Sequence, residues 1–253
     1  MNVFGGRGVR GKKGARGDSG INTMATFFPI TLVKNLQKHD ENCCFAITSS
    51  TDLVTKDHII TTWLSRSGRG DLKMEKPVEK VEVADHRFSL SFKKGRFTND
   101  DLYFLPNTPG SFGFICITFK IKSAGVLISS YQNPSVSFRE IMGRPDSLTI
   151  TLDDQNEIIQ HSFDKWTTLW LSYHANVETT LWEYSINNDT RLCGSFTSPS
   201  ISETHSALSM GSRFNDNFFF DGEVASFETY HVESTEYFPN SIKKIIISQQ
   251  LVE

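Results

Sequence analysis

Short segments that alternate between hydrophobic and polar residues fill most of the chain after residue 88. In SLTITL the hydrophobic side chains Leu148, Ile150 and Leu152 fall on one face, with threonines opposite. TLWEYSI at residues 180–186 alternates in the same way. A period of two predicts half-buried β-strands. Because such segments recur at a spacing of roughly 8–12 residues, they predict an all-β sandwich of antiparallel sheets.

The segment at residues 112–121 differs, because it is apolar on both faces. One face of this segment carries Ile115, Ile117, Phe119 and Ile121, and the other carries Phe112, Phe114 and Cys116. This pattern predicts a strand that is covered on both sides at its start.

The chain divides into three parts by this pattern. Residues 1–20 are rich in glycine, 21–84 form a connecting or N-terminal part of the globular region, and 85–253 form the predicted sandwich. Within the second part we expect a short helix at Leu32–Lys38, and an exposed loop followed by a short strand at residues 63–83. The tail at residues 239–251 fits either a helix or a strand.

Glycine returns at every third position of the first part. It occupies Gly5, Gly8, Gly11, Gly14, Gly17 and Gly20. Three chains wound around one axis leave room there only for glycine, so this period resembles the Gly-X-Y repeat of collagen. No proline occupies the other positions. We therefore expect the end of a longer collagenous stalk, or a short piece held by a trimeric domain.

The charge of the first part allows other interpretations. Residues 1–20 carry five lysines and arginines against one aspartate, a net +4, while the remainder carries 21 against 28, a net −7. Arginine–glycine tails that bind RNA and flexible linkers have similar compositions. RNA-binding tails tolerate irregular spacing, so the strict period favours collagen, and we expect no nucleic-acid partner.

Composition indicates a globular protein outside the membrane. Hydrophobic residues make up 38% of the chain and charged residues 22%. The longest apolar runs are too short for a membrane span, and residues 1–20 do not have the pattern of a secretion signal. A collagen-like segment requires the secretory route, so we expect an extracellular protein whose signal sequence is not present in this chain.

Four cysteines and one glycosylation motif bear on that location. The cysteines are Cys43, Cys44, Cys116 and Cys193. Their spacing fits no zinc or redox motif, and adjacent cysteines rarely bond each other. Cys43 or Cys44 joined to Cys116 or Cys193, bonds between chains, and a buried thiol at Cys116 all remain open. Asn188 begins the sequon Asn-Asp-Thr in a turn-like stretch.

Three stretches resemble the laminin-G and pentraxin-like domains. They are WTTLWLSY at residues 166–173, GVLISS at 125–130, and Met210-Gly211 followed by FDGEVASFETY at 220–230. The resemblance covers roughly residues 85–250 and implies a concanavalin A-like jelly roll. It implies no single function, because this architecture hosts many.

The resemblance also implies a calcium site at the rim of the sandwich, since such domains often bind calcium through Asp and Asn. The candidate ligands are Asn215, Asp216, Asn217 and Asp221. Calcium prefers several oxygen ligands, but a polar hairpin loop would have the same composition. The E-x-D-x-E motif of jelly-roll glucanases is absent, and neither HExxH nor GxSxG occurs. We therefore expect no enzyme.

Two RGD tripeptides match the integrin-adhesion motif. Arg16, Gly17 and Asp18 lie inside the glycine repeat, where a triple helix would impose the wrong geometry. Arg69, Gly70 and Asp71 follow another glycine in a polar stretch that favours an exposed loop. For this second copy, a glycine turn with solvated charges is the alternative.

Taken together, the sequence predicts a secreted or pericellular adhesion protein. Three chains joined by the collagen-like part would present three sandwiches, and avidity would strengthen weak binding to a matrix protein, a glycan or a receptor. The alternative is a structural domain that trimerises and registers collagen chains without a ligand of its own.

Overall fold

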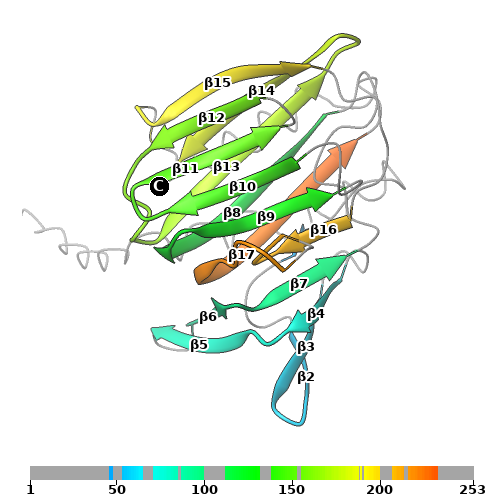
Figure 1. The fold of residues 1–253 in the computed structure, drawn as a ribbon, viewed down its shortest axis with the longest axis vertical. Helices are drawn as coiled ribbons and strands as arrows, with labels where there is room; N and C mark the ends of the chain where they lie inside the picture. The colour runs from blue at the N-terminus through cyan, green and yellow to red at the C-terminus, as the bar shows by residue number, and fades with distance from the viewer. Residues whose placement is uncertain are drawn as a thin grey trace, which may run out of the picture.

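The fold is known from a computed structural model, which describes residues 46–47, 53–64, 71–84, 87–99, 112–131, 138–152, 155–187, 189, 191–199, 207–213 and 216–232. Within these residues the chain forms β-strands and no α-helix. The strands build two antiparallel sheets that pack face to face (Figure 1). The prediction of an all-β sandwich of antiparallel sheets is therefore confirmed.

The front sheet is the nearer one in Figure 1. Its strands, in spatial order, are β12 (Gln155–Gln160), β11 (Ser147–Leu152), β10 (Phe138–Arg144), β9 (Gly125–Tyr131), β16 (Ala207–Met210), β7 (Arg96–Asn99), β4 (Leu72–Lys76), β3 (Ile59–Trp63) and β2 (Leu53–Lys56).

The back sheet has the order β15 (Cys193–Pro199), β14 (Thr179–Ile186), β13 (Thr167–Ala175), β8 (Phe112–Ser123), β17 (Asp221–Val232), β6 (Arg87–Lys93) and β5 (Glu79–Ala84). The short strand β1 (Ala46–Ile47) also pairs with β17. The long strands β8 and β17 lie side by side in the middle of this sheet, where both of their edges are paired.

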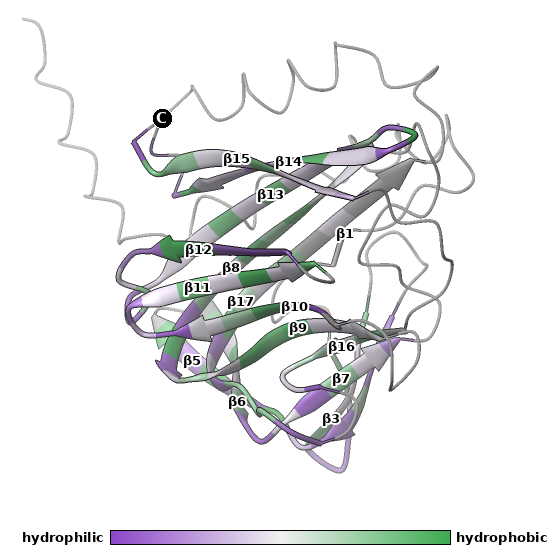
Figure 2. Ribbon diagram, turned by 45° about the horizontal axis from the view of Figure 1, so that its top comes forward, coloured by the Kyte–Doolittle hydropathy of each residue, from purple (hydrophilic) through white to green (hydrophobic). Residues whose placement is uncertain are grey.

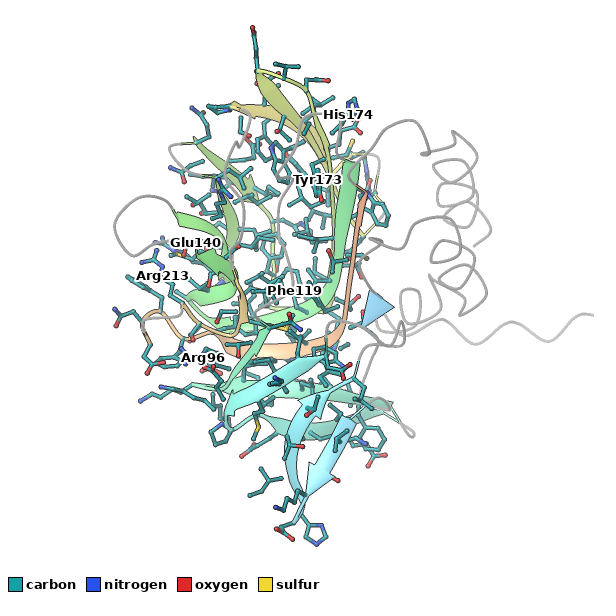
Figure 3. All side chains as sticks on the ribbon, turned by 90° about the vertical axis from the view of Figure 1, so that its right-hand side faces the viewer. Arg96, Phe119, Glu140, Tyr173, His174 and Arg213 are labelled. Carbon is teal, nitrogen blue, oxygen red and sulfur yellow. The ribbon has the colours of Figure 1, made fainter. Side chains whose placement is uncertain are left out.

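The hydrophobic core lies between the two sheets. The predicted inward faces of β11 and β8 are confirmed, because Leu148, Ile150 and Phe119 have no exposed surface. Figure 2 shows hydrophobic residues alternating with polar ones along these strands, and Figure 3 shows Phe119 between the sheets. Cys116, on the opposite face of β8, is also fully buried. The expectation that β8 is covered on both sides is therefore confirmed at Cys116.

Strands before residue 85 belong to the same two sheets. The strands β4 and β5 pair directly with β7 and β6. Trp63 of β3 has no exposed surface, and its ring centroid lies 6.0 Å from that of Phe97. Phe97 and Phe220 in turn lie 6.0 and 5.9 Å from Phe92. Residues 53–64 and 71–84, which the sequence assigned to a connecting or N-terminal part of the globular region, therefore contribute both strands and core.

Several expectations fall outside the described residues. These are the Gly-X-Y segment, the helix at 32–38, Cys43, Cys44 and the tail at 239–251. No helix in the described ranges is long and apolar enough to cross a membrane.

Candidate functional site

The loop that joins β16 to β17, residues 211–220, is the most distinctive polar feature of the structure. We call it the β16–β17 loop. Its ends are closed by a hydrogen bond in which the Phe220 amide donates to the Gly211 carbonyl over 2.8 Å. Phe220 is fully buried and packs edge-on against Phe92. The two ends of the loop are thus joined by a hydrogen bond, and its C-terminal end is anchored in the core.

Two glycines allow the loop to lie close to the sheets. Gly211 has φ of +100°, and a Cβ there would lie 2.4 Å from the Gly95 carbonyl oxygen. At Gly125 on β9, a Cβ would lie 2.2 Å from the Phe219 carbonyl oxygen. Only glycine fits either position without displacing backbone.

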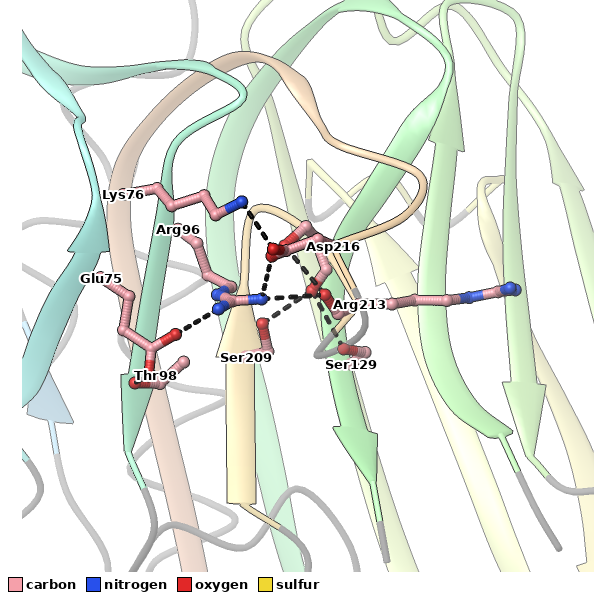
Figure 4. A network of polar contacts seen from close by, with 9 residues as sticks. Glu75, Lys76, Arg96, Thr98, Ser129, Ser209, Arg213 and Asp216 are labelled. Atoms are coloured by element: carbon pink, nitrogen blue, oxygen red, sulfur yellow. Dashed lines mark hydrogen bonds and ion pairs between the residues drawn. The ribbon is translucent and has the colours of Figure 1, made fainter. Parts of the chain in front are cut away.

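Ion pairs attach the middle of the loop to strands β4 and β7 (Figure 4). The Asp216 carboxylate accepts from Lys76 Nζ at 2.8 Å and from an Arg96 terminal nitrogen at 2.7 Å. Arg96 also pairs with Glu75, which accepts a hydrogen bond from Thr98. The Arg96 side chain is largely buried, whereas those of Asp216 and Glu75 are about half exposed, so solvent screens these contacts in part.

A second ion pair attaches the loop to β10. Arg213 donates two hydrogen bonds of 2.6 Å to the two carboxylate oxygens of Glu140. Exposed fractions of these side chains are 18% for Arg213 and 4% for Glu140. Beneath them, the hydroxyls of Ser129 and Ser209 both donate to the Ser212 carbonyl. The two hydrogen bonds between Arg213 and Glu140 form a bidentate ion pair, which is among the strongest ion pairs in proteins.

These ion pairs lower the pKa of Asp216 and raise the pKa of Arg213, and both shifts favour the charged forms that make the ion pairs. The hydrogen bond from Lys76 and the charge of Arg96 lower the pKa of Asp216 below its ordinary value of 3.8, against an opposing effect of desolvation. The hydrogen bonds to Glu140 raise the pKa of Arg213. The loop therefore stays charged and attached at neutral pH.

Among the described residues of the loop, Phe218 is an exposed aromatic side chain, with 55% of its surface open to solvent. Its φ is +56°, a left-handed conformation that is rare for a bulky residue. The guanidinium of Arg213 lies 4.3 Å from its ring centroid. Strained residues of this kind persist only where their surroundings hold them, and they cluster at functional sites.

The backbone of Phe218 is hydrogen-bonded to β9, the strand next to the outward face of β10–β12. The Val126 amide donates to the Phe218 carbonyl over 2.8 Å. In register, Val126 is followed across the strands by Met142, Thr149 and Ile158. Ile158 is 57% exposed, and both Met142 and Thr149 are half-buried. We call Met142, Thr149 and Ile158 the outer row.

Hydrogen-bonding groups border the outer row. Arg144, two residues after Met142 on β10, is exposed. Asn156 is exposed on β12, and its side-chain carbonyl oxygen accepts a hydrogen bond from the Thr151 hydroxyl. Figure 3 shows Arg213 and Glu140 on this outer side of the front sheet. A ligand on this face would meet the outer row and these polar groups together, with the Phe218 backbone held to β9 beside them.

The predicted calcium ligands fall on or beside this loop. Asn217 is exposed, Asp221 begins β17, and Asn215 lies outside the described residues. Both oxygens of Asp216 are engaged by cations, so a calcium ion would have to displace Lys76 and Arg96. The described residues contain no cluster of three His, Cys, Asp or Glu that could hold a metal. Calcium binding stays a prediction.

The other predicted sites are scattered over the fold. Cys116 on β8 and Cys193 on β15 are separated by two intervening strands, through Trp170 and Ser185 in register. Three strand spacings amount to about 14 Å, too far for these two cysteines to bond each other. Their bonding to Cys43 or Cys44 stays a prediction.

The adhesion and glycosylation motifs are only partly described. Asp71 precedes β4, and its carbonyl accepts from the Asn99 side chain at 2.7 Å. Arg69, Gly70, the first RGD copy and Asn188 lie outside the described residues. Next to Asn188, two hydrogen bonds from the Arg191 side chain and one from its amide lower the pKa of Asp189 to about 2.

Sequence reasoning missed the residues that define the β16–β17 loop, namely Glu75, Lys76, Arg96, Glu140, Arg213 and Phe218. The triplet Phe218-Phe219-Phe220 was a usable signal, because three adjacent phenylalanines before a strand cannot all face one core. The pattern does not reveal which ring is exposed.

Comparisons with known proteins identify the architecture alone. No family model and no curated protein matches the chain. Among solved structures, a tryptophan-to-alanine mutant of HCR/D is 14% identical with a TM-score of 0.51, covering 81% of this chain and 50% of that one. At such identity the likeness supports the β-sandwich fold and no function.

Other solved structures are similar at lower scores. The binding domain of botulinum neurotoxin DC in complex with SialylT is 14% identical, covers 83% of this chain and 51% of its own, and has a TM-score of 0.48. An arabinofuranosidase complexed with arabinofuranosyl-xylobiose is 8% identical, covers 76% and 51%, and has a TM-score of 0.47. The chain thus spans about half the length of the solved chains named here, which include a binding domain and a hydrolase. That this chain is not an enzyme stays a prediction.

Proposed function

We propose that this chain is a glycan-binding module whose site combines Phe218 with the outer row of the front sheet. The observation that carries the proposal is the exposed Phe218 ring, held in a left-handed backbone by a loop with ion pairs on both sides. Jelly-roll sandwiches are an architecture that lectin domains use.

The chemistry of a sugar fits these groups. A pyranose ring presents C–H groups on its faces and hydroxyls around its edge. The exposed ring of Phe218 offers an apolar, polarisable surface to such a face. Because Arg213 is held by Glu140, the ring is fixed before a ligand arrives, and less ordering entropy is lost on binding.

The outer row extends the contact beyond one sugar. From Val126 on β9 to Ile158 on β12 the row crosses three strand spacings, about 14 Å, which exceeds the length of a monosaccharide. Arg144 and Asn156 flank the row with donors for hydroxyl or carboxylate oxygens. The site therefore suits an oligosaccharide that lies across the strands.

The wider setting of this module is also a proposal. It is an extracellular protein with a collagen-like segment, and association of several copies would let weak sites act together. A matrix protein or receptor that carries the glycan would then be its partner.

A panel of immobilised oligosaccharides, neutral and sialylated, tests the function. The wild-type chain should bind at least one member of the panel, and Phe218→Ala should weaken that binding at least tenfold, about 1.4 kcal/mol. The matched control is Ile59→Ala, because Ile59 is 56% exposed on the distant β2–β3 hairpin. Absence of binding to the whole panel, or equal binding by Phe218→Ala, would contradict the proposal.

A further inference from the structure

The two sheets end in four edge strands, which differ in how they are protected. An edge strand offers unpaired backbone groups to any other strand, and proteins usually block it with bulges, charges or proline. Within the described part of the chain, the edges of the front sheet are β12 and β2, and those of the back sheet are β15 and β5.

Three of these edges carry such protection. The strand β2 has only four residues, a register shift and Lys56. The strand β5 has a register shift and the charged run Glu79, Lys80 and Glu82. On β12, Glu157 points inward and accepts a hydrogen bond from the Tyr184 hydroxyl at 3.4 Å.

The strand β15 lacks these devices. Its seven residues, CGSFTSP, include no charge, and they pair with β14 without a register shift. Its one proline, Pro199, is the last residue of the strand. In Figure 2, β15 carries green and pale colours, whereas β12 has a purple, hydrophilic stretch.

The sequence of β15 suits antiparallel pairing with β15 of a second copy of the chain. Phe196 is the middle residue, so a two-fold axis near it would place each Phe196 beside its counterpart. Phe196 is half-buried and stacks on Trp182 with ring centroids 6.0 Å apart, and Trp182 packs on Tyr173. The same axis would set Ser195 opposite Thr197, two small polar residues.

We propose that β15 pairs antiparallel with β15 of a second copy of this chain, so that the two back sheets become continuous. The pairing is isologous, since each strand gives and receives the same contacts. Backbone hydrogen bonds supply the attraction, and the row of Tyr173, Trp182 and Phe196 continues across the axis into the same row of the other copy. With no charge on β15, no like charges meet at the seam.

Light scattering and sedimentation of the full chain over a range of concentrations test the pairing. The wild type should form a dimer that dissociates on dilution. The seam variant Ser195→Lys/Thr197→Lys places lysines opposite lysines across the axis, and both positions are exposed. It should weaken dimerisation at least tenfold, about 1.4 kcal/mol.

The control variant Gln155→Lys/Gln160→Lys adds the same charge to exposed positions of the β12 edge, and it should dimerise as the wild type does. A wild-type monomer at all concentrations, a trimer, a seam variant that dimerises normally, or dissociation of both variants would overturn the proposal. If the seam variant does not fold, amide hydrogen exchange of the wild type decides. Exchange along β15 should slow as concentration rises, and unchanged exchange would refute the pairing.

Discussion

Replacing Phe218 by glycine and by alanine separates the two roles of this residue. Both variants remove the ring and its contact with Arg213, so they differ only in backbone preference. At a φ of +56° an L-residue other than glycine bears about 1–2 kcal/mol of strain. Glycine avoids that strain, but its greater freedom in the unfolded chain offsets about 0.5–1 kcal/mol.

The balance favours Phe218→Gly over Phe218→Ala by about 0.5–1 kcal/mol in free energy of unfolding. With a urea m-value of about 2 kcal/mol/M, the two unfolding midpoints should differ by roughly 0.3–0.5 M. Both variants should lose glycan binding to the same extent, because neither has the ring.

Urea unfolding and binding to the oligosaccharide panel would be measured on the same samples. If Phe218→Ala is as stable as Phe218→Gly, the backbone is not held left-handed in solution. If the glycine variant binds glycans as the wild type does, the ring is not the contact, and the proposed site is wrong.

Three further perturbations test how the loop is held. Gly211→Ala should destabilise the protein by about 2 kcal/mol or more, because its Cβ would meet the Gly95 carbonyl at a φ of +100°; a midpoint equal to wild type in urea would contradict this. Glu140→Ala should cost about 3 kcal/mol, since it leaves the largely buried Arg213 charge without its carboxylate, and adding Arg213→Ala should recover part of the loss in a double-mutant cycle. The lowered pKa of Asp216 stabilises the fold above its ordinary value of 3.8 and stops doing so as pH falls through the lower folded value; the stability difference between wild type and Asp216→Asn should therefore be present at pH 7 and shrink below pH 3.8, as urea unfolding at several pH values would show.

Local alternation predicted much of this fold because many of the strands after residue 87 contrast an inner with an outer face. Leu148, Ile150 and Leu152 are buried on β11, as the pattern indicates. The strands β4 and β5 were harder to foresee, since LKMEK and EKVEVA are dominated by charges. Their place is decided by pairing with β7 and β6, which no local pattern contains.

The β16–β17 loop could not be predicted for the same reason. Arg213 and Glu140 are 73 positions apart, and Arg96 and Asp216 are 120 apart. The resemblance to laminin-G-like domains implied a metal site at this cluster of Asn and Asp, but the side chains that meet Asp216 are cations from β4 and β7. Which side chains gather around a loop depends on strand order, and strand order depends on the whole core.

The burial of Trp63 limits where the chain can be divided. A fragment that starts at residue 85 would lack β2–β5, expose one side of Phe97 and leave β6 and β7 as new unprotected edges. Such a fragment should expose apolar surface and associate non-specifically. A sandwich that is cut at residue 85 is therefore incomplete. Any transfer of the domain to another protein must include the strands from Leu53 onward.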